Sequence, residues 1–308
     1  MRVGFDDRPA TDPHGLGRYT RAILTALVAE AVERGGEVVA TAHPRRVDVL
    51  HVPWADGAPL RPRSPMIVTL HDLFTLKRPG EALRAGLRAR MRKLALERAA
   101  RIIVPTAAVA RDAAGLLRVD ADRVHVIPKA PDAAFTQRGP DEIAAVRERY
   151  GLPRAYLLWV GALQHPDPRR RVPALVALPR ELDLVLVGEP GRWARRLPDV
   201  HLTGVVSDDE LAALYSGARA LLLPADDEGF GLPGVEALAC GTPVVACALP
   251  ALQEVLGTRA TFVERDDLAG LIAAAEAAER PAPAPPHWTW ADAADATWTV
   301  YERALASA

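Results

Sequence analysis

The densest group of chemically useful residues lies in the segment LPADDEGFGLPGVEALACGTPVV, in the second half of the chain. Its two glutamates, Glu228 and Glu236, can accept hydrogen bonds from the hydroxyl groups of a sugar. Gly229 and Gly231 allow the backbone to come close to a ligand, and Pro233 suits the first turn of a helix, whose amide groups attract an anion. The segment therefore predicts a site for an anion that carries hydroxyl groups; the alternative is a solvated turn.

The elements that would position this segment are short apolar strands alternating with amphipathic helices. We expect strands at 2–6, 37–41, 47–52, 66–71, 101–105, 123–128, 156–161, 184–188, 200–203, 220–224, 244–246 and 261–263. Helical periodicity covers, among others, 17–34, 81–100, 208–217, 233–240, 266–278 and 288–305. The strands are too apolar to leave one face in water, which is typical of parallel sheets covered by helices. The sequence therefore predicts an α/β protein with two doubly wound, Rossmann-like sheets.

The domain boundary is indicated at 132–153, where glycine and proline interrupt the alternation around one helical segment. We expect an N-terminal domain over 1–140, a C-terminal domain over 151–287 and a last helix over 288–308. Ligands of doubly wound sheets bind outside the carboxyl ends of the strands. A cleft between the two domains is therefore the expected place of a functional site.

The composition excludes several classes of protein. The 308 residues include 38 basic and 39 acidic ones, a net charge of −1, whereas a nucleic-acid-binding protein would normally be basic. The charge is uneven, with 25 basic and 18 acidic residues in 1–150 (+7) and 13 and 21 in the remainder (−8). Cys240 and Cys247 are too few for a disulfide scaffold or a thiolate zinc site. The sequence shows no membrane span and no signal peptide, so we expect a cytoplasmic protein.

The segment around the two glutamates resembles the signature of the retaining nucleotide-sugar glycosyltransferases of group 1 (family 4), which have the two-domain GT-B fold. Other pieces match in the family's order, namely GLGRYT, VTLHD, RVHVIP, YLLWVG and GVVSDDELAALY. The resemblance implies that a sugar passes from a nucleoside-diphosphate sugar to an acceptor hydroxyl with retention of configuration. It also implies that no metal or other cofactor is used, and that the last helix crosses back to the N-terminal domain.

The resemblance also implies roles for individual residues. Glu228 and His71 would lie beside the reacting sugar, with His71 as a hydrogen-bond donor or a local electrostatic group. Glu236 would hold the ribose hydroxyls. Asp72 caps a turn. Further donor-binding contacts would come from Gly17, Gly161, Val205, Val206, Phe230, Gly231 and Leu232.

The chain departs from the family pattern in two places. The family usually has an arginine directly after the glycine of the first C-terminal strand, whereas Ala162 follows Gly161 here. Arg170 takes the place of the family's lysine, and it could neutralise the charge that builds on a leaving diphosphate. Lys129 stands where the family usually has asparagine, and it could supply the missing charge instead. Both assignments stay open, as does a solvated basic run.

Two other functions stay open as well. A nucleotide-sugar epimerase would need an acid and a base in the cleft, and none is assigned. A catalytically weak relative that only binds nucleotide sugars would explain the missing arginine. Asp120 and Asp122 form an Asp-x-Asp pattern that binds metal in another glycosyltransferase fold. Because they precede a strand, where aspartate terminates turns, we expect no metal site.

A helical segment over 83–101 bears on the acceptor and on localisation. It places Leu83, Leu87, Met91 and Leu94 on one face and Arg84, Arg88, Arg92 and Arg98 elsewhere. A basic amphipathic helix can lie on an anionic membrane; the alternative is a helix packed on the core with a solvated basic side. The expected partners are thus a nucleotide sugar and an acceptor sugar, lipid-linked sugar or small molecule. The protein would act in the cytoplasm or at the inner membrane surface.

Overall fold

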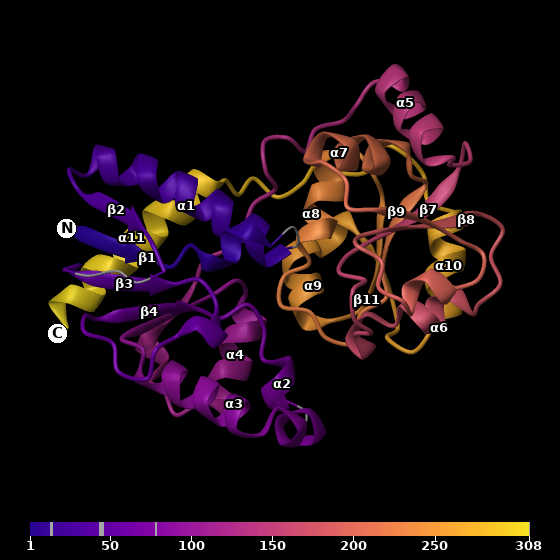
Figure 1. Cartoon of the computed structure of the whole chain (residues 1–308). Helices are drawn as coiled ribbons and strands as arrows, with labels where there is room; N and C mark the ends of the chain where they lie inside the picture. Colours follow the sequence, from indigo (N-terminus) through magenta and orange to yellow (C-terminus); the bar gives the residue numbers. More distant parts are fainter. Residues whose placement is uncertain (13–14, 43–45, 78, 308) are drawn as a thin grey trace. The chain divides into compact units, whose positions relative to one another are not determined.

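A computed structural model describes the chain except residues 13–14, 43–45, 78 and 308 and the side chains of 75 and 79–85. The chain forms two compact units (Figure 1). Unit 1 contains Met1–Ala130 and Trp288–Ala308, and unit 2 contains Pro131–His287. The first unit therefore ends at Ala130, ahead of the predicted end at residue 140, and the last helix belongs to it.

Unit 1 is built on a six-stranded parallel sheet with the order β2-β1-β3-β4-β5-β6. Its strands are β1 (Arg2–Phe5), β2 (Glu37–Ala40), β3 (Val49–Val52), β4 (Met66–Thr69), β5 (Arg101–Val104) and β6 (Val124–Val126). Its helices are α1 (Gly15–Glu33), α2 (Phe74–Lys77), α3 (Pro79–Arg98), α4 (Ala107–Leu116) and α11 (Trp290–Ala306), with short 3-10 turns η1 (Arg8–Thr11), η2 (Ala55–Gly57) and η3 (Ala121–Arg123). All residues of β4 and most residues of β3 and β5 are buried, as expected for a sheet covered on both faces.

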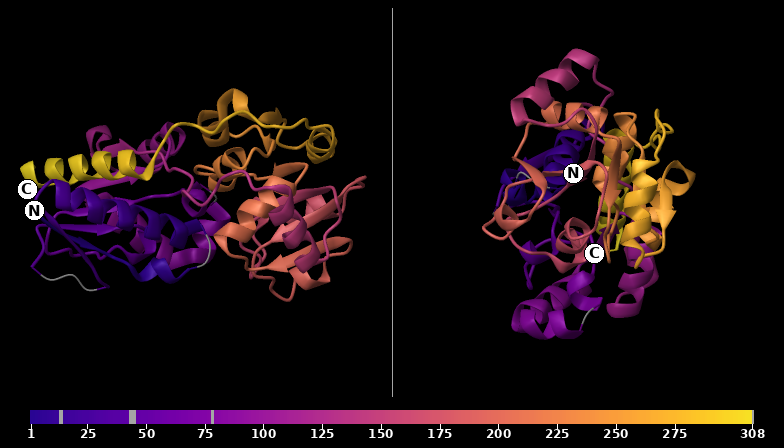
Figure 2. Two further views of the ribbon diagram at one scale, coloured as in Figure 1. Left: turned by 90° about the horizontal axis from the view of Figure 1, so that it is seen from above. Right: turned by 90° about the vertical axis from the view of Figure 1, so that its right-hand side faces the viewer.

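The last helix, α11, packs along α1 (Figure 2). Its buried side chains Trp298 and Tyr301 join Ile23 and Leu27 of α1 in one apolar core. The helix begins at a capping box, because the Thr289 hydroxyl accepts a hydrogen bond from the amide of the third helical residue and that residue's carboxylate reaches back. The last helix is thus part of the core of unit 1.

Unit 2 repeats the architecture with the order β12-β11-β10-β7-β8-β9, all parallel. Its strands are β7 (Tyr156–Val160), β8 (Asp183–Val187), β9 (Val200–Gly204), β10 (Ala220–Leu223), β11 (Val244–Cys247) and β12 (Thr261–Val263). Its helices are α5 (Pro140–Tyr150), α6 (Val172–Val176), α7 (Asp208–Gly217), α8 (Leu232–Ala239), α9 (Pro250–Leu256) and α10 (Leu268–Glu276), with 3-10 turns η4 (Pro168–Arg170), η5 (Ala194–Arg196) and η6 (Gly257–Arg259).

The predicted fold class is confirmed. Every predicted strand forms, and the ends of the predicted strands and helices differ from the observed ones by at most two residues. The named periodic segments do not include α2, α4, α6 and α9; α2 and α6 have only 4 and 5 residues, too few to show an amphipathic pattern. Both cysteines are buried in the core of unit 2.

The strand orders place one switch point in each sheet, where successive connections leave in opposite directions. In unit 1 it lies between β1 and β3, and in unit 2 between β7 and β10. Doubly wound sheets bind ligands outside the carboxyl ends of the strands at this point. The loops that follow these four strands are therefore the first places to look for a site.

Candidate functional site

Two loops of unit 2 are joined at its switch point. The loop after β7 contains the arginine run that ends at Arg171, and the loop after β10 contains Glu228. The amide of Asp226 donates a hydrogen bond to the carbonyl oxygen of Arg169, with 2.7 Å between N and O. The Arg171 guanidinium lies 3.5 Å from the Asp226 carboxylate. The loop with the predicted cation is therefore fixed to the loop with the predicted acid.

The three arginines of the first loop differ in what they contact. Arg169 forms a two-pronged ion pair with Asp167, at 3.0 and 2.8 Å. Burial opposes charge on Asp167, but the hydrogen bonds and charge of Arg169 outweigh it and hold the pKa of that carboxyl below its usual value. Arg170 is 3.8 Å from Asp167, and its Nη1 would be 3.4 Å from a Cβ placed on Gly161. The Arg170 guanidinium therefore lies over the end of β7, where the sequence predicts a phosphate contact.

The second loop presents its backbone and Glu228 while its apolar side chains point inward. Phe230 is 1% exposed and Leu232 is 7% exposed. Gly231 has φ +81°, a conformation that favours glycine, and a Cβ there would be 2.4 Å from the Leu252 side chain. Glu228 is partly exposed, and its carboxylate accepts a hydrogen bond of 3.3 Å from the next amide. The buried side chains and the conformation of Gly231 hold the backbone of this loop in place. The predicted contacts of the loop with a donor remain predictions.

Glu236 is buried, unlike Glu228. Its side chain is on α8 and has 0% exposed surface, and its Oε2 accepts a hydrogen bond of 3.1 Å from the Tyr215 hydroxyl. The carboxyl group of Glu236 has no accessible surface in this structure, and its predicted contact with a ribose remains a prediction. A buried carboxyl needs hydrogen-bond partners, and here one of them fastens α8 to α7.

Val205 and Val206 follow the end of β9. The preceding Gly204 has φ +77°, which turns the chain at this edge, and Val205 is 52% exposed. The two residues are thus accessible at the carboxyl edge of unit 2. Their predicted contact with a nucleotide base remains a prediction.

Gly17 lies in the first turn of α1 in unit 1 and is buried. A Cβ at this position would be 1.9 Å from the carbonyl oxygen of Asp12 and 2.8 Å from that of Pro9. The glycine is therefore required by the packing of α1 against η1. The predicted approach of Gly17 to a diphosphate or sugar remains a prediction.

His71 follows β4 and has a defined tautomer. Its Nε2 lies 2.9 Å from the Pro53 carbonyl oxygen, which can only accept, so Nε2–H donates there. Burial, together with the charge of Lys129, holds the pKa of His71 well below 6.5, and the ring is neutral. Among the described residues no partner reaches the buried Nδ1. In this tautomer the remaining ring nitrogen can only accept a hydrogen bond, and the predicted role of His71 beside the reacting sugar, as a donor or a local electrostatic group, remains a prediction.

Lys129 lies in the same part of unit 1 as His71. The Lys129 ammonium is 5.5 Å from the centre of the Tyr19 ring, and the edge of that ring meets His71 with centroids 4.7 Å apart. Lys129 thus places a positive charge beside His71, whereas Arg170 places one in unit 2. The predicted turn cap is confirmed, since the Asp72 carboxylate accepts a hydrogen bond of 3.1 Å from the Phe74 amide.

A buried polar network supports this region and has no signal in the sequence. His51 on β3 bonds the Tyr301 hydroxyl at 2.6 Å through Nδ1 and the Thr69 hydroxyl at 2.8 Å through Nε2. Thr69 in turn lies 3.1 Å from the Tyr19 hydroxyl. The network connects α11, β3, β4 and α1, four elements that no local motif relates.

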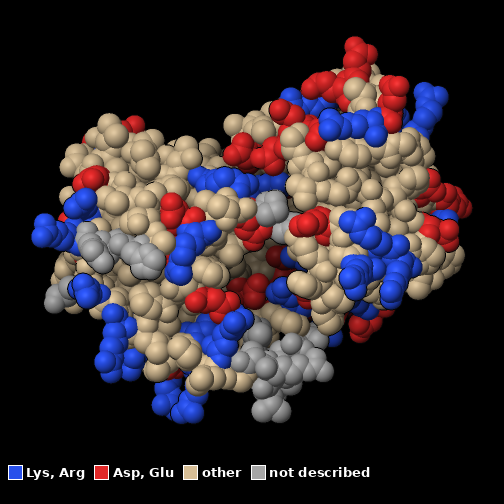
Figure 3. All heavy atoms as spheres, viewed as in Figure 1, with Lys and Arg blue, Asp and Glu red and all other residues tan. Residues whose placement is uncertain are grey.

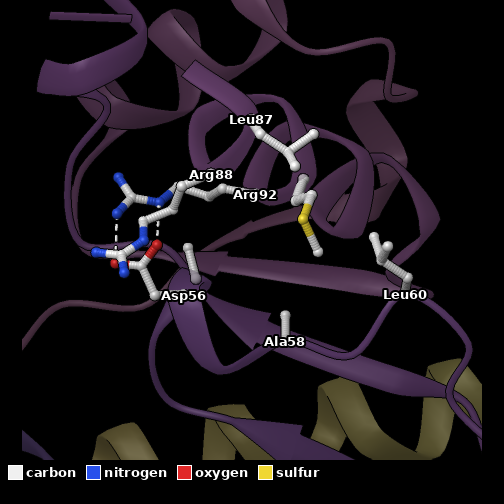
Figure 4. A pocket seen from close by; sticks show the side chains of 8 residues that line it. Asp56, Ala58, Leu60, Leu87, Arg88 and Arg92 are labelled. Carbon is white, nitrogen blue, oxygen red and sulfur yellow. Dashed lines mark hydrogen bonds and ion pairs between the residues drawn. The ribbon is translucent and has the colours of Figure 1, made fainter. Parts of the chain in front are cut away.

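Two cavities open on the described surface of unit 1. The first, of about 340 Å³, lies between α3 and η2, and its mostly apolar wall includes Leu60, Leu87 and Met91 (Figure 4). Arg92 and Asp56 form a two-pronged ion pair at its rim. The second, of about 430 Å³, lies beside the loops that follow β1 and β3.

The predicted amphipathic helix corresponds to α3. Leu87 is 72% exposed, Met91 45% and Leu94 37%, so an apolar row faces outward beyond the kink at Gly86. The side chains of Leu83 and Arg84 lie outside the described residues. Among the described helices, none has both the length and the apolar character needed to cross a bilayer.

Figure 3 shows that basic and acidic side chains occur on both units.

The sequence matches two families of known proteins. Residues 154–278 match the family described as Glycosyl transferases group 1, and residues 34–135 match Glycosyltransferase Family 4. A D-inositol 3-phosphate glycosyltransferase of Mycolicibacterium gilvum is 33% identical, over 87% of this chain and 68% of that protein. A protein of the same name from Xylanimonas cellulosilytica is 33% identical, over 68% of this chain and 57% of that protein. The chain thus spans about two thirds of the first relative and less of the second.

The fold agrees with a solved structure over the whole chain. That structure is HepE of Anabaena in complex with UDP and glucose, with a TM-score of 0.69. The alignment covers 100% of this chain and 96% of that chain at 16% sequence identity. At this identity the agreement concerns the fold, which is the GT-B arrangement of two Rossmann-like units.

Proposed function

Because the chain belongs to the glycosyltransferases of group 1 and family 4, we propose that it moves a sugar from a nucleoside-diphosphate sugar to a hydroxyl group of an acceptor. The proposal rests on one observation: two loops at the switch point of unit 2 are joined by a hydrogen bond between the Asp226 amide and the Arg169 carbonyl. One of these loops contains Arg170 and the other contains Glu228. HepE, which shares the fold, was solved with UDP and glucose, and this supports a nucleotide-sugar donor.

We assign the donor to unit 2. Negative charge builds on the diphosphate as the glycosidic bond breaks, and a fixed positive group nearby stabilises it. Arg170 supplies that group over the end of β7, and the start of α8 adds the positive end of a helix dipole. The Glu228 carboxylate accepts hydrogen bonds from hydroxyl groups of the transferred sugar. Arg169 and Arg171 hold the loops and do not take part in this contact.

We assign the acceptor to unit 1 and propose retention of configuration without a metal ion. The acceptor oxygen forms the new bond to the anomeric carbon on the face from which the diphosphate leaves. The proton of the acceptor hydroxyl passes to a departing phosphate oxygen, so that atoms and charge balance. Neutral His71 serves as a hydrogen-bond acceptor near this reaction through Nδ1. The relative from Mycolicibacterium gilvum is named for a phosphorylated polyol, which is consistent with a polar acceptor.

The epimerase alternative has no support among the described residues. An epimerase needs an acid and a base at the same carbon. The two relatives described above are named as glycosyltransferases. A protein that only binds nucleotide sugars would bind the donor without releasing the nucleoside diphosphate, whereas an enzyme would release it.

The proposal is tested by incubating the protein with UDP-, GDP- and TDP-sugars and following release of the nucleoside diphosphate. We expect hydrolysis or transfer with at least one donor, and loss of this activity in Glu228→Gln. Binding without release would leave only a nucleotide-sugar-binding protein. Interconversion of sugar epimers without release would contradict transfer.

A further inference from the structure

Tyr19, in the GLGRYT segment, is a buried residue near the start of α1. It shares the core of unit 1 with Ile23 and Leu27, and the spacing of four residues places these side chains on one face of the helix. The Tyr19 hydroxyl lies 3.1 Å from the hydroxyl of Thr69, the last residue of β4. Tyr19 is therefore at the carboxyl end of this strand, the edge of a doubly wound sheet at which ligands bind.

The Tyr19 ring contacts three groups that come from different segments. The His71 ring, which follows β4, lies nearly perpendicular to it, at 77° and with the centroids 4.7 Å apart. The Lys129 ammonium, which follows β6, lies over the ring at 5.5 Å from its centre. The indole of Trp290, the first residue of α11, packs on it with 5.8 Å between centroids. A branched aliphatic side chain could occupy the same volume, but only an aromatic ring attracts a cation to its face.

The hydroxyl end of Tyr19 is held by a chain of buried hydrogen bonds. The chain runs from Tyr19 to Thr69, then to His51 at 2.8 Å and on to Tyr301 at 2.6 Å. None of these four residues exposes more than 5% of its surface. Burial raises the pKa of Tyr19 to about 12, so its hydroxyl keeps the proton at neutral pH. The ring is therefore fixed from β3, β4 and α11 as well as from its own helix.

The fixed ring restrains both His71 and Lys129. The hydrogen bond from Nε2 to the Pro53 carbonyl holds one end of the His71 ring and lets the ring pivot about that bond. The perpendicular packing on Tyr19 sets the tilt of the imidazole, and with it the direction of Nδ1. The lysine side chain has a flexible four-carbon stem, and the ring face holds its ammonium near the imidazole.

We propose that Tyr19 is a positioning residue for the transfer reaction: its ring sets the direction in which His71 presents Nδ1 and holds the Lys129 ammonium beside that imidazole. Of the groups that face His71, Lys129 and His51 disfavour a proton on the ring, and the Pro53 carbonyl favours it. The arrangement thus keeps Nδ1 a hydrogen-bond acceptor. The inference rests on the proposed function, in which His71 accepts a hydrogen bond near the reaction.

The test is steady-state kinetics of the whole chain with UDP-glucose, GDP-mannose and TDP-glucose, combined with NMR titration of His71. With a donor that the unmodified chain turns over, Tyr19→Leu is expected to lower kcat at least tenfold. It should leave KM for the donor within threefold, because donor binding is assigned to unit 2. The pKa of His71 should rise toward 6.5, because the ring no longer shields the imidazole or holds the ammonium. Tyr19→Phe keeps the ring and should recover most of the lost kcat and the low pKa.

The matched control is Tyr301→Phe, which removes one buried hydroxyl from the far end of the same hydrogen-bonded chain. We expect it to lower the melting temperature and to leave kcat and the pKa of His71 as in the unmodified chain. Lys129→Met tests the same arrangement from a partly exposed position and keeps a side chain of similar length. Without the ammonium the imidazole takes up a proton more easily, so the acid side of the kcat profile should move to higher pH.

Three results would overturn the inference: full kcat in a folded Tyr19→Leu variant, an equal loss of kcat in Tyr301→Phe, or an unchanged pH profile in Lys129→Met. Each of them leaves the proposed function intact, because the unmodified chain still turns over its donor. If Tyr19→Leu does not fold, the pH profile of Lys129→Met decides. If the unmodified chain releases no nucleoside diphosphate from any of the three donors, the proposed function fails. The pKa of His71 in the two Tyr19 variants then still supports or overturns the positioning.

Discussion

The backbone amide of Asp226 lies 2.7 Å from the carbonyl oxygen of Arg169. This contact joins the loop after β7 to the loop after β10 at the switch point of unit 2. It leaves Arg170 over Gly161 and Glu228 in the adjoining loop. The bond joins backbone groups, and the Arg169 side chain holds the same loop through its ion pair with Asp167.

Arg170→Ala is expected to weaken the affinity for a nucleoside diphosphate about ten- to hundredfold. A hydrogen bond to a charged group contributes roughly 1.5–3 kcal/mol, and about 1.4 kcal/mol corresponds to a factor of ten. Titration with UDP and GDP measures the change. Arg195→Ala, an exposed arginine of η5 in the same unit, serves as the control and should bind as the unmodified chain does. Equal affinities of the Arg170 variant and the control would contradict the phosphate contact.

Arg169→Ala should reduce stability as well as affinity, in contrast to the Arg170 variant. Removal of Arg169 leaves the half-buried Asp167 without the partner that keeps its pKa low. The lowered pKa contributes stability above the ordinary carboxyl pKa, and this stability is lost as the pH falls. The destabilisation by Arg169→Ala should therefore be larger at pH 7 than at pH 3 in denaturant titrations. A loss that does not depend on pH would contradict this role.

Tyr215→Phe is expected to reduce the free energy of unfolding by about 1–3 kcal/mol, because it leaves the buried carboxyl of Glu236 without one of its donors. Its affinity for UDP should change less than that of Arg170→Ala. Urea denaturation and UDP titration of the same preparations provide the two numbers. If Tyr215→Phe lost UDP affinity while its stability stayed unchanged, Glu236 would have a direct binding role.

Stability should fall as the pH drops below about 6.5, because two histidines of unit 1 are buried in the neutral form. Burial lowers the pKa of His51 to about 3 and that of His71 well below 6.5. The unfolded chain binds protons below pH 6.5 while the folded chain does not, so unfolding becomes easier with acid by about 1.4 kcal/mol per pH unit for each histidine. The charged and polar groups that face the two rings are Asp6, Lys129, the Pro53 carbonyl and the hydroxyls of Thr69 and Tyr301.

Lys129→Ala should raise the pKa of His71, since the ammonium is one of the groups that lower it. The loss of stability in acid that His71 causes should then be smaller, because its folded-state pKa lies closer to the unfolded value. NMR titration of the histidine signals measures the pKa directly. Lys93→Ala, which removes a partly exposed lysine of α3 that lies 3.9 Å from Glu97, is the control. An unchanged His71 pKa in Lys129→Ala would show that the charge of Lys129 does not reach the ring.

The sequence predicts the strands and helices of the molecule better than the contacts of its candidate site. Strands and long helices follow from apolar runs and periodicity, and Gly231 and Pro233 mark the start of α8 correctly. The burial of Glu236 could not be predicted, because it depends on Tyr215, which lies in another helix. The tautomer of His71 depends on the Pro53 carbonyl from a neighbouring strand end. Such contacts are set by tertiary packing and leave no local pattern.

The central claim is tested most directly by a crystal structure with a nucleoside-diphosphate sugar bound. The account predicts phosphate oxygens within hydrogen-bond distance of the Arg170 guanidinium, and a hydroxyl of the transferred sugar on the Glu228 carboxylate. A nucleotide bound elsewhere on unit 2, with Arg170 and Glu228 both free of it, would contradict the account.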